Sequence, residues 1–325
     1  GWSFEPDAEK RDAQVASGSL IYEGGSRKVN ISAMLYSPVQ YKTSPKNHQF
    51  DYKAIAEIAE KYKPKLIITG GTAYPRVINH KKIKSISKKI GAYYLADIAH
   101  EAGLIAGGAF PSPVGIADVV TMTTHKTLKS GRGAIILAHE DLIKKINLAI
   151  LPGLQGGPHN HNIAGICVGL GEAMKPAFKK YATQVIKNTA ELANQLQQQN
   201  FKLVTNGTDK HFVLINLSEE PILGRPFARV LALAGITTNY STMPWDSRPP
   251  RNPSALRLGT PWLTTRGMKA KEMKQIAKWI RGAMNIASAW KDMSFEDIEA
   301  QAKKSKDIKR IAQEVKQRCK KFPGE

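Results

Sequence analysis

The chain has 325 residues, of which 42% are hydrophobic and 23% are charged, and this composition is typical of a globular protein. It has no apolar run long enough to span a membrane, and its first residues lack the pattern of a secretory signal. Cys167 and Cys319 lie far apart without a CxxC motif, so we expect neither a disulfide framework nor a metal site. These features predict a cytoplasmic protein.

The formal net charge of +21 is large for this length. Such a charge attracts polyanions, including nucleic acids and acidic substrates. Lysines also decorate the solvated faces of helices without any specific partner, and the lysines here are scattered through amphipathic segments without interleaved aromatic residues. The pattern therefore favours solvated lysines, although nucleic-acid binding stays possible.

Residues 1–26 differ in composition from the rest of the chain. They carry more acidic than basic side chains, whereas the remainder is strongly basic, and they show no sustained helical or strand period. We therefore predict an atypical, poorly ordered N-terminal segment over 1–26.

From about residue 50, helical and strand patterns alternate. Asp51 is suited to cap a helix that Pro64 ends, and Asn79 is suited to cap a second helix that ends at Gly91. Buried strands are predicted at 65–71, 92–97, 117–124 and 134–139. This alternation is typical of an α/β sheet flanked by helices.

After residue 158 the grouping of helices and strands changes to that of an α+β unit. The predicted elements are a long helix over 160–199, strands at 201–207 and 211–217, a helix near 225–234, a strand at 254–259, and helices at 267–287 and 295–320. We predict an incomplete large α/β domain over 27–175 and a C-terminal α+β domain over 176–325. The boundary falls within the long helix.

Polar side chains that could hold a cofactor follow the predicted strands. Asp97, Thr72 and the His125–Lys126 pair lie just past strand ends, where α/β sheets bind ligands. A nucleophilic lysine must be largely deprotonated, which burial or a nearby cation such as Arg132 favours. Alone, Asp97 could be a helix cap and Lys126 a surface lysine. Together they indicate a pyridoxal-phosphate site, in which an acid faces the ring nitrogen of the cofactor.

Hydroxyl groups surround the candidate lysine in the sequence. Thr123, Thr124 and Thr127 precede and follow Lys126, and their hydroxyls are suited to bind a phosphate group. The segment therefore combines a reactive amine with phosphate ligands.

Five segments of the chain closely resemble signature segments of serine hydroxymethyltransferase, a fold-type I pyridoxal-phosphate enzyme, and they occur in the same order. They read DIAHEAGLIAGG, TTHKTLKSGRGAII, LPGLQGGP, NGTDKHFVLINL and LRLGTPWLTTRG. The resemblance runs from about Val29 to the C-terminus. It implies a mixed, mostly parallel sheet flanked by helices, with pyridoxal 5'-phosphate as cofactor and tetrahydrofolate as co-substrate. The implied reaction is the reversible transfer of a one-carbon unit from serine to tetrahydrofolate, which leaves glycine.

The resemblance also implies roles for individual residues. Lys126 corresponds to the lysine that binds the cofactor covalently, Asp97 to the acid on its ring nitrogen, and Arg257 to the arginine that pairs with the amino acid carboxylate. Arg132 corresponds to an arginine that would favour the unprotonated amine of Lys126. The other implied cofactor-binding residues are His100, which would also be catalytic, and Thr72, Thr123, His125, Gly156 and Gly157. In the family, the two glycines are presented by the neighbouring subunit of a homodimer.

The chain departs from the family pattern in its N-terminal part. Family members begin upstream, where they supply tyrosines near the active site, a glutamate that acts in proton transfer and a serine–glycine–serine segment on the cofactor phosphate. The histidine that stacks on the pyridine ring in the family also has no counterpart, because Gly24 and Gly25 run directly into SRKVNIS. Tyr240 and Ser241 also replace residues that are expected to contact folate. The resemblance therefore implies cofactor binding and leaves turnover open.

Two other functions remain open from the sequence alone. A folate-independent aldolase that cleaves β-hydroxy amino acids would need fewer of the groups without a counterpart here. Alternatively, the chain could be a non-catalytic relic of the fold, with a structural or nucleic-acid-binding role.

Overall fold

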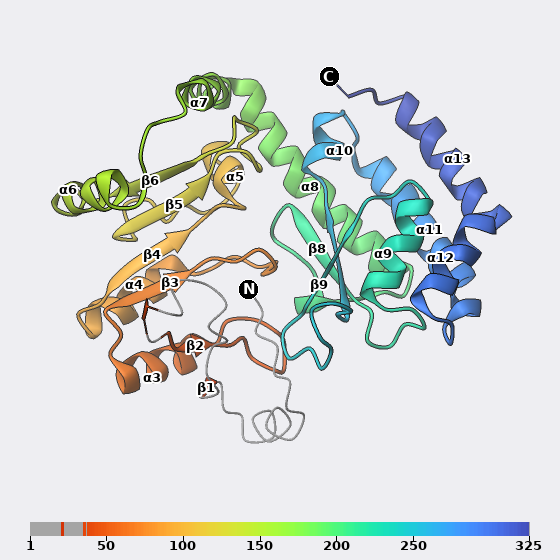
Figure 1. Ribbon diagram of the computed structural model, residues 1–325, viewed down its shortest axis with the longest axis horizontal. Helices are drawn as coiled ribbons and strands as arrows, with labels where there is room; N and C mark the ends of the chain where they lie inside the picture. The colour runs from red at the N-terminus through yellow and green to blue at the C-terminus, as the bar shows by residue number, and fades with distance from the viewer. Residues whose placement is uncertain (1–20, 23–34, 37, 325) are drawn as a thin grey trace. The chain divides into compact units, whose positions relative to one another are not determined.

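The computed structural model describes residues 21–22, 35–36 and 38–324 (Figure 1). The chain forms two compact units, of which one comprises Asp51–Thr183 and the other Gly1–Phe50 with Gln184–Glu325. Most of the segment 1–26 that was predicted to be poorly ordered lies outside the described residues. Within it, β1 (Ile21–Tyr22) pairs antiparallel with β2 (Gln40–Tyr41). The domain limits drawn from the sequence stay a prediction.

A four-stranded sheet organises the unit Asp51–Thr183. Its strands are β3 (Leu66–Thr69), β4 (Tyr93–Asp97), β5 (Val119–Thr123) and β6 (Ala134–Ala138), in the order β3-β4-β5-β6. The first three strands run parallel and β6 runs antiparallel to β5. The prediction of a mixed, mostly parallel sheet is therefore confirmed.

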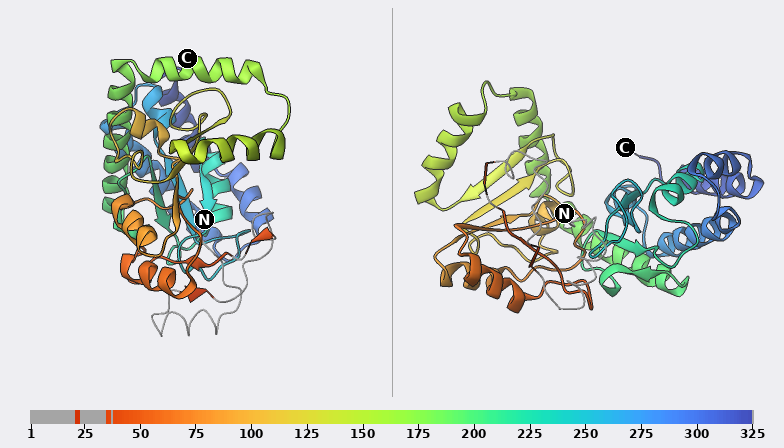
Figure 2. Two further views of the ribbon diagram at one scale, coloured as in Figure 1. Left: turned by 90° about the vertical axis from the view of Figure 1, so that its left-hand side faces the viewer. Right: turned by 60° about the horizontal axis from the view of Figure 1, so that its bottom comes forward.

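Two capped helices lie together on one side of this sheet, drawn in orange in Figures 1 and 2. In α3 (Tyr52–Tyr62), the Asp51 carboxylate accepts the N–H groups of Lys53 at 3.0 Å and Ala54 at 3.1 Å. In α4 (His80–Lys89), the Asn79 side chain accepts the N–H of Lys82 at 3.0 Å. Both predicted caps are confirmed, because each side chain satisfies N–H groups that lack a partner within the helix.

The long helix predicted over 160–199 is wrong as one element. The chain instead forms α7 (Asn160–Ala173) and α8 (Pro176–Gln198). Pro176 has no N–H to donate, and its ring disfavours a helical conformation in the preceding residue, so it begins a new helix. The short helices α5 (Ala102–Ala106) and α6 (Glu140–Leu148) and the π-helix η1 (Ala149–Leu154) complete the unit.

The second unit contains an antiparallel sheet in the order β7-β8-β10-β9. Its strands are β7 (Lys202–Leu203), β8 (Phe212–Asn216), β9 (Asn239–Ser241) and β10 (Ala255–Gly259). The strand predicted over 201–207 is too long, because Val204–Asn206 form the 3-10 helix η2 with Thr205 at a φ of 60°. The prediction did not include the three-residue strand β9.

Helices pack against this sheet around one hydrophobic core. They are α9 (Gly224–Leu233), α10 (Pro261–Thr265), α11 (Ala270–Ala287), the short η3 (Ser288–Trp290), α12 (Phe295–Lys304) and α13 (Lys306–Lys320). The core includes Phe227, Leu256 and Ile280, which are fully buried. The single helix predicted over 295–320 divides at Ser305, whose hydroxyl accepts the N–H of Ile308 and so begins α13.

None of the helices that the structure describes combines the length and apolar character needed to cross a membrane.

Candidate active site

Asp97 is the last residue of β4, and the neighbouring strand fixes the orientation of its carboxylate. The parallel register places Asp97 beside Thr121 of β5. The Thr121 hydroxyl donates to Oδ2 of Asp97 at 2.9 Å, and the N–H of Ala99 donates to Oδ1 at 3.0 Å. Both carboxylate oxygens therefore accept a hydrogen bond, which holds the side chain in a single conformation.

Four side-chain hydrogen bonds join the end of β4 and the segment that follows it to the segment that carries Lys126. Besides the Thr121 bond, the Thr123 hydroxyl donates to the carbonyl of Ala99 at 3.2 Å, and the Thr127 hydroxyl donates to the carbonyl of His100 at 2.9 Å. Thr127 also accepts the N–H of Gly103 at 3.0 Å. The structure therefore brings the predicted acid and the predicted lysine onto two segments that are bonded to each other.

Gly103 allows this close approach. A Cβ atom at this position would lie 2.0 Å from the carbonyl oxygen of Thr127, far closer than any real contact. A larger residue would therefore push the lysine segment away from the turn after β4.

Lys126 lies in a short connection between the antiparallel strands β5 and β6. Across its base, the N–H of Thr124 donates to the carbonyl of Gly133 at 3.1 Å, and the hydroxyl of Thr124 donates to the carbonyl of Gly131 at 2.5 Å. Lys126 itself is half-buried. The side chains of Thr124 and Thr127 are buried and bonded within the protein, so their predicted contact with a phosphate is wrong.

His125 and Arg132 lie next to each other beside the candidate lysine. Nη1 of Arg132 donates to Nε2 of His125 at 3.4 Å, which assigns the ring proton to Nδ1. Burial, then the positive charges of Arg132 and Lys126, lower the pKa of His125, so the ring is largely neutral at pH 7. The backbone of Gly133 acts in the opposite direction and raises the pKa, while Nδ1 is buried without a well-formed hydrogen bond.

The remaining predicted cofactor ligands lie on loops of the same unit. Thr72 is exposed after β3, and His100 is half-buried in the turn after β4. Gly70, two residues before Thr72, has a φ of 136° and packs so closely on Asp97 that a Cβ would lie 2.5 Å from the Asp97 carbonyl oxygen. Gly156 and Gly157 are exposed between η1 and α7, and a Cβ there would meet no atom within 4 Å.

Arg257 belongs to the other compact unit, in the middle of β10. It pairs with Leu214 of β8 and Asn239 of β9. Its guanidinium lies 5.8 Å from the ring centre of Phe212, and burial lowers its pKa while leaving it a cation at neutral pH. This position offers a fixed, half-buried positive charge to an anionic group.

A mixed sheet that carries a lysine segment and a doubly bonded carboxylate at its strand ends is typical of fold-type I pyridoxal-phosphate enzymes. Comparison with known proteins identifies the particular group. The serine hydroxymethyltransferase family model matches residues 15–280. This match begins closer to the N-terminus than the resemblance seen from Val29 onward.

Named relatives agree with this match. The serine hydroxymethyltransferase of Acidothermus cellulolyticus is 42% identical over 295 residues, which are 91% of this chain and 67% of that protein. The enzyme of Sorangium cellulosum is 42% identical over 310 residues, or 95% of this chain and 69% of that protein. The enzyme of Phenylobacterium zucineum is 45% identical over 267 residues, or 82% and 62%. The chain belongs to the serine hydroxymethyltransferase family, whose members are pyridoxal-phosphate-dependent transferases, and it spans about two thirds of the length of these relatives.

The sequence interpretation did not single out Thr121 and Gly103. Thr121 was a strand residue without an assigned role, although the parallel pairing of the two predicted strands could have placed it beside Asp97. Gly103 has no local signal of its importance, because its constraint is the backbone of Thr127, which lies in a different loop.

Proposed function

We propose that this chain interconverts serine and glycine with transfer of a one-carbon unit to tetrahydrofolate, using pyridoxal 5'-phosphate as cofactor. The observation that carries the proposal is the bonded pair of segments that holds Asp97 and Lys126 at one edge of the sheet. When bound, the cofactor withdraws electrons from the α-carbon of the amino acid. The chain's own residues have to hold the cofactor, keep its ring nitrogen protonated and orient the substrate.

Each of these tasks has a candidate residue. Lys126 supplies an amine for covalent attachment. The carboxylate of Asp97, which Thr121 and Ala99 hold in place, is proposed to face the ring nitrogen and keep it protonated. The residues proposed to line the cofactor are His125, His100, Thr72 and Thr123.

Arg257 is proposed to bind the carboxylate of serine or glycine. A guanidinium can form two parallel hydrogen bonds to a carboxylate, and partial burial strengthens such a pair. On β9, Tyr240 and Ser241 stand where the family pattern has other folate-contacting residues, so we propose that folate binds weakly.

We infer that a polypeptide of these 325 residues alone turns over slowly. The resemblance assigns proton transfer to a glutamate and places tyrosines near the active site, and neither has a counterpart among these residues. General acid–base groups typically contribute about 10²–10⁴-fold each to the rate. Covalent attachment of the cofactor through Lys126 does not need the glutamate or the tyrosines, so cofactor binding and turnover should separate in an experiment.

The proposal is tested by adding pyridoxal phosphate to the purified chain and recording its visible absorbance. Cofactor bound through a lysine should give a band that Lys126→Ala abolishes. Lys129→Gly is the matched control, because Lys129 lies in the same loop with a φ of 60° that glycine adopts freely. A chain without the band at saturating cofactor, or a band that survives in Lys126→Ala, contradicts the proposal.

The dependence of the reaction on tetrahydrofolate distinguishes the transferase from the alternative, a folate-independent aldolase. If the band forms, serine is added with and without tetrahydrofolate, and glycine production is measured. Glycine that appears only with tetrahydrofolate supports the transferase. Cleavage of a β-hydroxy amino acid at the same rate without folate supports the aldolase.

A homodimer is proposed as the functional assembly. The helices and loop around Gly156 and Gly157 expose large apolar side chains, namely Leu148, Leu151, Leu154, Val168 and Met174, with exposures of 57%, 55%, 87%, 67% and 87%. Exposed apolar surface of this kind marks interaction sites. A second copy that covers it would lie against the two glycines, as the family resemblance implies.

A further inference from the structure

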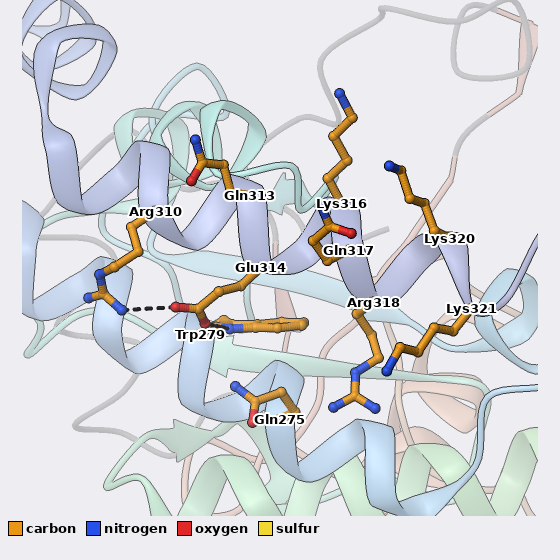
Figure 3. A pocket seen from close by; sticks show the side chains of 10 residues that line it. All are labelled: Gln275, Trp279, Arg310, Gln313, Glu314, Lys316, Gln317, Arg318, Lys320 and Lys321. Carbon is orange, nitrogen blue, oxygen red and sulfur yellow. Dashed lines mark hydrogen bonds and ion pairs between the residues drawn. The ribbon is translucent and has the colours of Figure 1, made fainter.

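A basic groove lies on the surface of the unit that contains α11 and α13. It has a volume of about 660 Å³, and these two helices and the residue that follows α13 line it (Figure 3). The lining includes Arg310, Lys316, Arg318, Lys320 and Lys321, with Glu314 as its carboxylate. We call this feature the α11–α13 groove.

The carboxylate of Glu314 already accepts hydrogen bonds from two side chains of the groove. Glu314 accepts a hydrogen bond from Nη1 of Arg310 at 2.9 Å and another from the indole N–H of Trp279 at 2.7 Å. Lys316, Lys320 and Lys321 are exposed and have no carboxylate partner among the described residues. Their charges are therefore available to an external anion.

Further lysines extend the charge on both sides of the groove. Lys306 and Lys309 are exposed on α13. On α11, Lys271 and Lys278 are exposed at positions four residues before and three residues after the lining residue Gln275, and residues at these spacings share a helix face. The groove therefore runs between two helices that each carry a row of lysines.

The side chains around the α11–α13 groove favour a nucleic acid over a membrane or a protein as its partner. The exposed large hydrophobic side chains of the described residues include none on α11 or α13. A membrane-binding helix needs an apolar face, and a protein partner usually engages aromatic or aliphatic anchors. Lysines with glutamine neighbours instead match phosphate and sugar oxygens, which take most protein hydrogen bonds to nucleic acid.

Trp279 cannot supply base stacking. Its ring is 8% exposed, and its N–H is bonded to Glu314 beneath α13. The groove can then bind a nucleic acid only through its phosphates and sugars, which are the same for every base sequence. We propose that the α11–α13 groove binds the phosphodiester backbone of nucleic acid without sequence specificity, as a second activity of the chain.

Not every lysine of a basic helix is available to an anion, as three lysines of α4 show. There, Lys84 pairs with Asp118 at 2.5 Å, Lys89 pairs with Glu60, and Lys82 lies 5.3 Å from the ring centre of Tyr52. Lys81 and Lys88 of α4 and Lys144 of α6 are also exposed, but they line no part of the α11–α13 groove. They offer a control with the same change of charge.

The test uses the full chain and a short fluorescein-labelled single-stranded RNA, with binding followed by fluorescence anisotropy between about 50 and 200 mM salt. The variant Lys316→Gln/Lys320→Gln/Lys321→Gln should bind about tenfold or more weakly. The slope of log affinity against log salt should fall by about 0.7 for each lost phosphate contact. The control Lys81→Gln/Lys88→Gln/Lys144→Gln should bind like the parent, and thermal unfolding should show that both variants are folded.

Other results overturn the proposal. If the control loses as much affinity as the groove variant, the binding reflects net charge and not the groove. If the groove variant binds like the parent, the RNA lies elsewhere. If poly-glutamate displaces the RNA as well as unlabelled RNA of equal charge does, the groove recognises acidic peptides instead.

Discussion

Thr121 ties the candidate acid to the neighbouring strand through the 2.9 Å bond from its hydroxyl to Asp97. Thr121→Val removes this donor without changing the shape of the side chain much. A hydrogen bond to a charged group is worth about 1.5–3 kcal/mol, so pyridoxal phosphate should bind about tenfold or more weakly. The measurement is a cofactor titration followed by absorbance.

Thr121→Ser is the matched control, because it keeps the hydroxyl and removes a methyl group. It should bind the cofactor nearly as the parent does. Equal affinities for the valine variant and the parent would show that Ala99 alone orients Asp97.

Arg132 and His125 form a pair whose pH dependence can be measured directly. Removing the cation in Arg132→Gln takes away a charge that disfavours the imidazolium, so the pKa of His125 should rise toward its ordinary value. NMR titration of the ring protons checks this, with the signal assigned from His125→Gln.

The effect should be partial, since burial is the larger cause of the lowered pKa and persists in the variant. Arg132→Lys keeps a positive charge and should leave the pKa near that of the parent. A pKa that falls in Arg132→Gln would contradict the structure.

The close packing between the segment after β4 and the segment that carries Lys126 requires a glycine, Gly103, at their contact. In Gly103→Ala the new Cβ would collide with the backbone carbonyl of Thr127, which cannot move without breaking the bonds of Thr127. Overpacking of this kind typically costs about 1–3 kcal/mol in the free energy of unfolding. Thermal unfolding should show the loss, and cofactor binding should weaken with it.

Gly171→Ala is the control for this change. It lies in α7, where a Cβ meets no atom within 4 Å, and alanine favours a helix over glycine by about 1 kcal/mol. It should therefore unfold at the same or a higher temperature. Equal destabilisation by both variants would mean that the contact with Thr127 is not the cause.

Elements whose signals are local were predictable from the sequence. Asp51 and Asn79 cap their helices as expected, because a cap depends on residues two or three positions away. The break at Pro176 was missed because the helical pattern continues on both sides of it. The role of Thr121 depends on the register between strands 24 residues apart, which no local pattern contains. The roles assigned to the site residues stay predictions.

At the scale of the whole molecule, the exposed apolar side chains near Gly156 and Gly157 predict association. Leu154→Glu and Met174→Glu place charges in this surface, so a dimer should dissociate in either variant because burying an unpaired charge is costly. Sedimentation velocity measures the outcome.

Met293→Glu is the control, since Met293 is also exposed, at 41%, but belongs to the other unit. It should leave the assembly unchanged. A parent chain that stays a monodisperse monomer at all concentrations would refute the predicted dimer.

The antiparallel pairing of β5 with β6 has a consequence for how the site forms. Lys126 lies in a connection of about ten residues, closed by pairing of Thr123 with Ala134. Contacts between residues this close in sequence cost little loop-closure entropy and form fast. Pairing of β5 with β6 should therefore form early in folding, whereas the bonds that join the Lys126 segment to the segment after β4 span 24 to 27 residues and should form later.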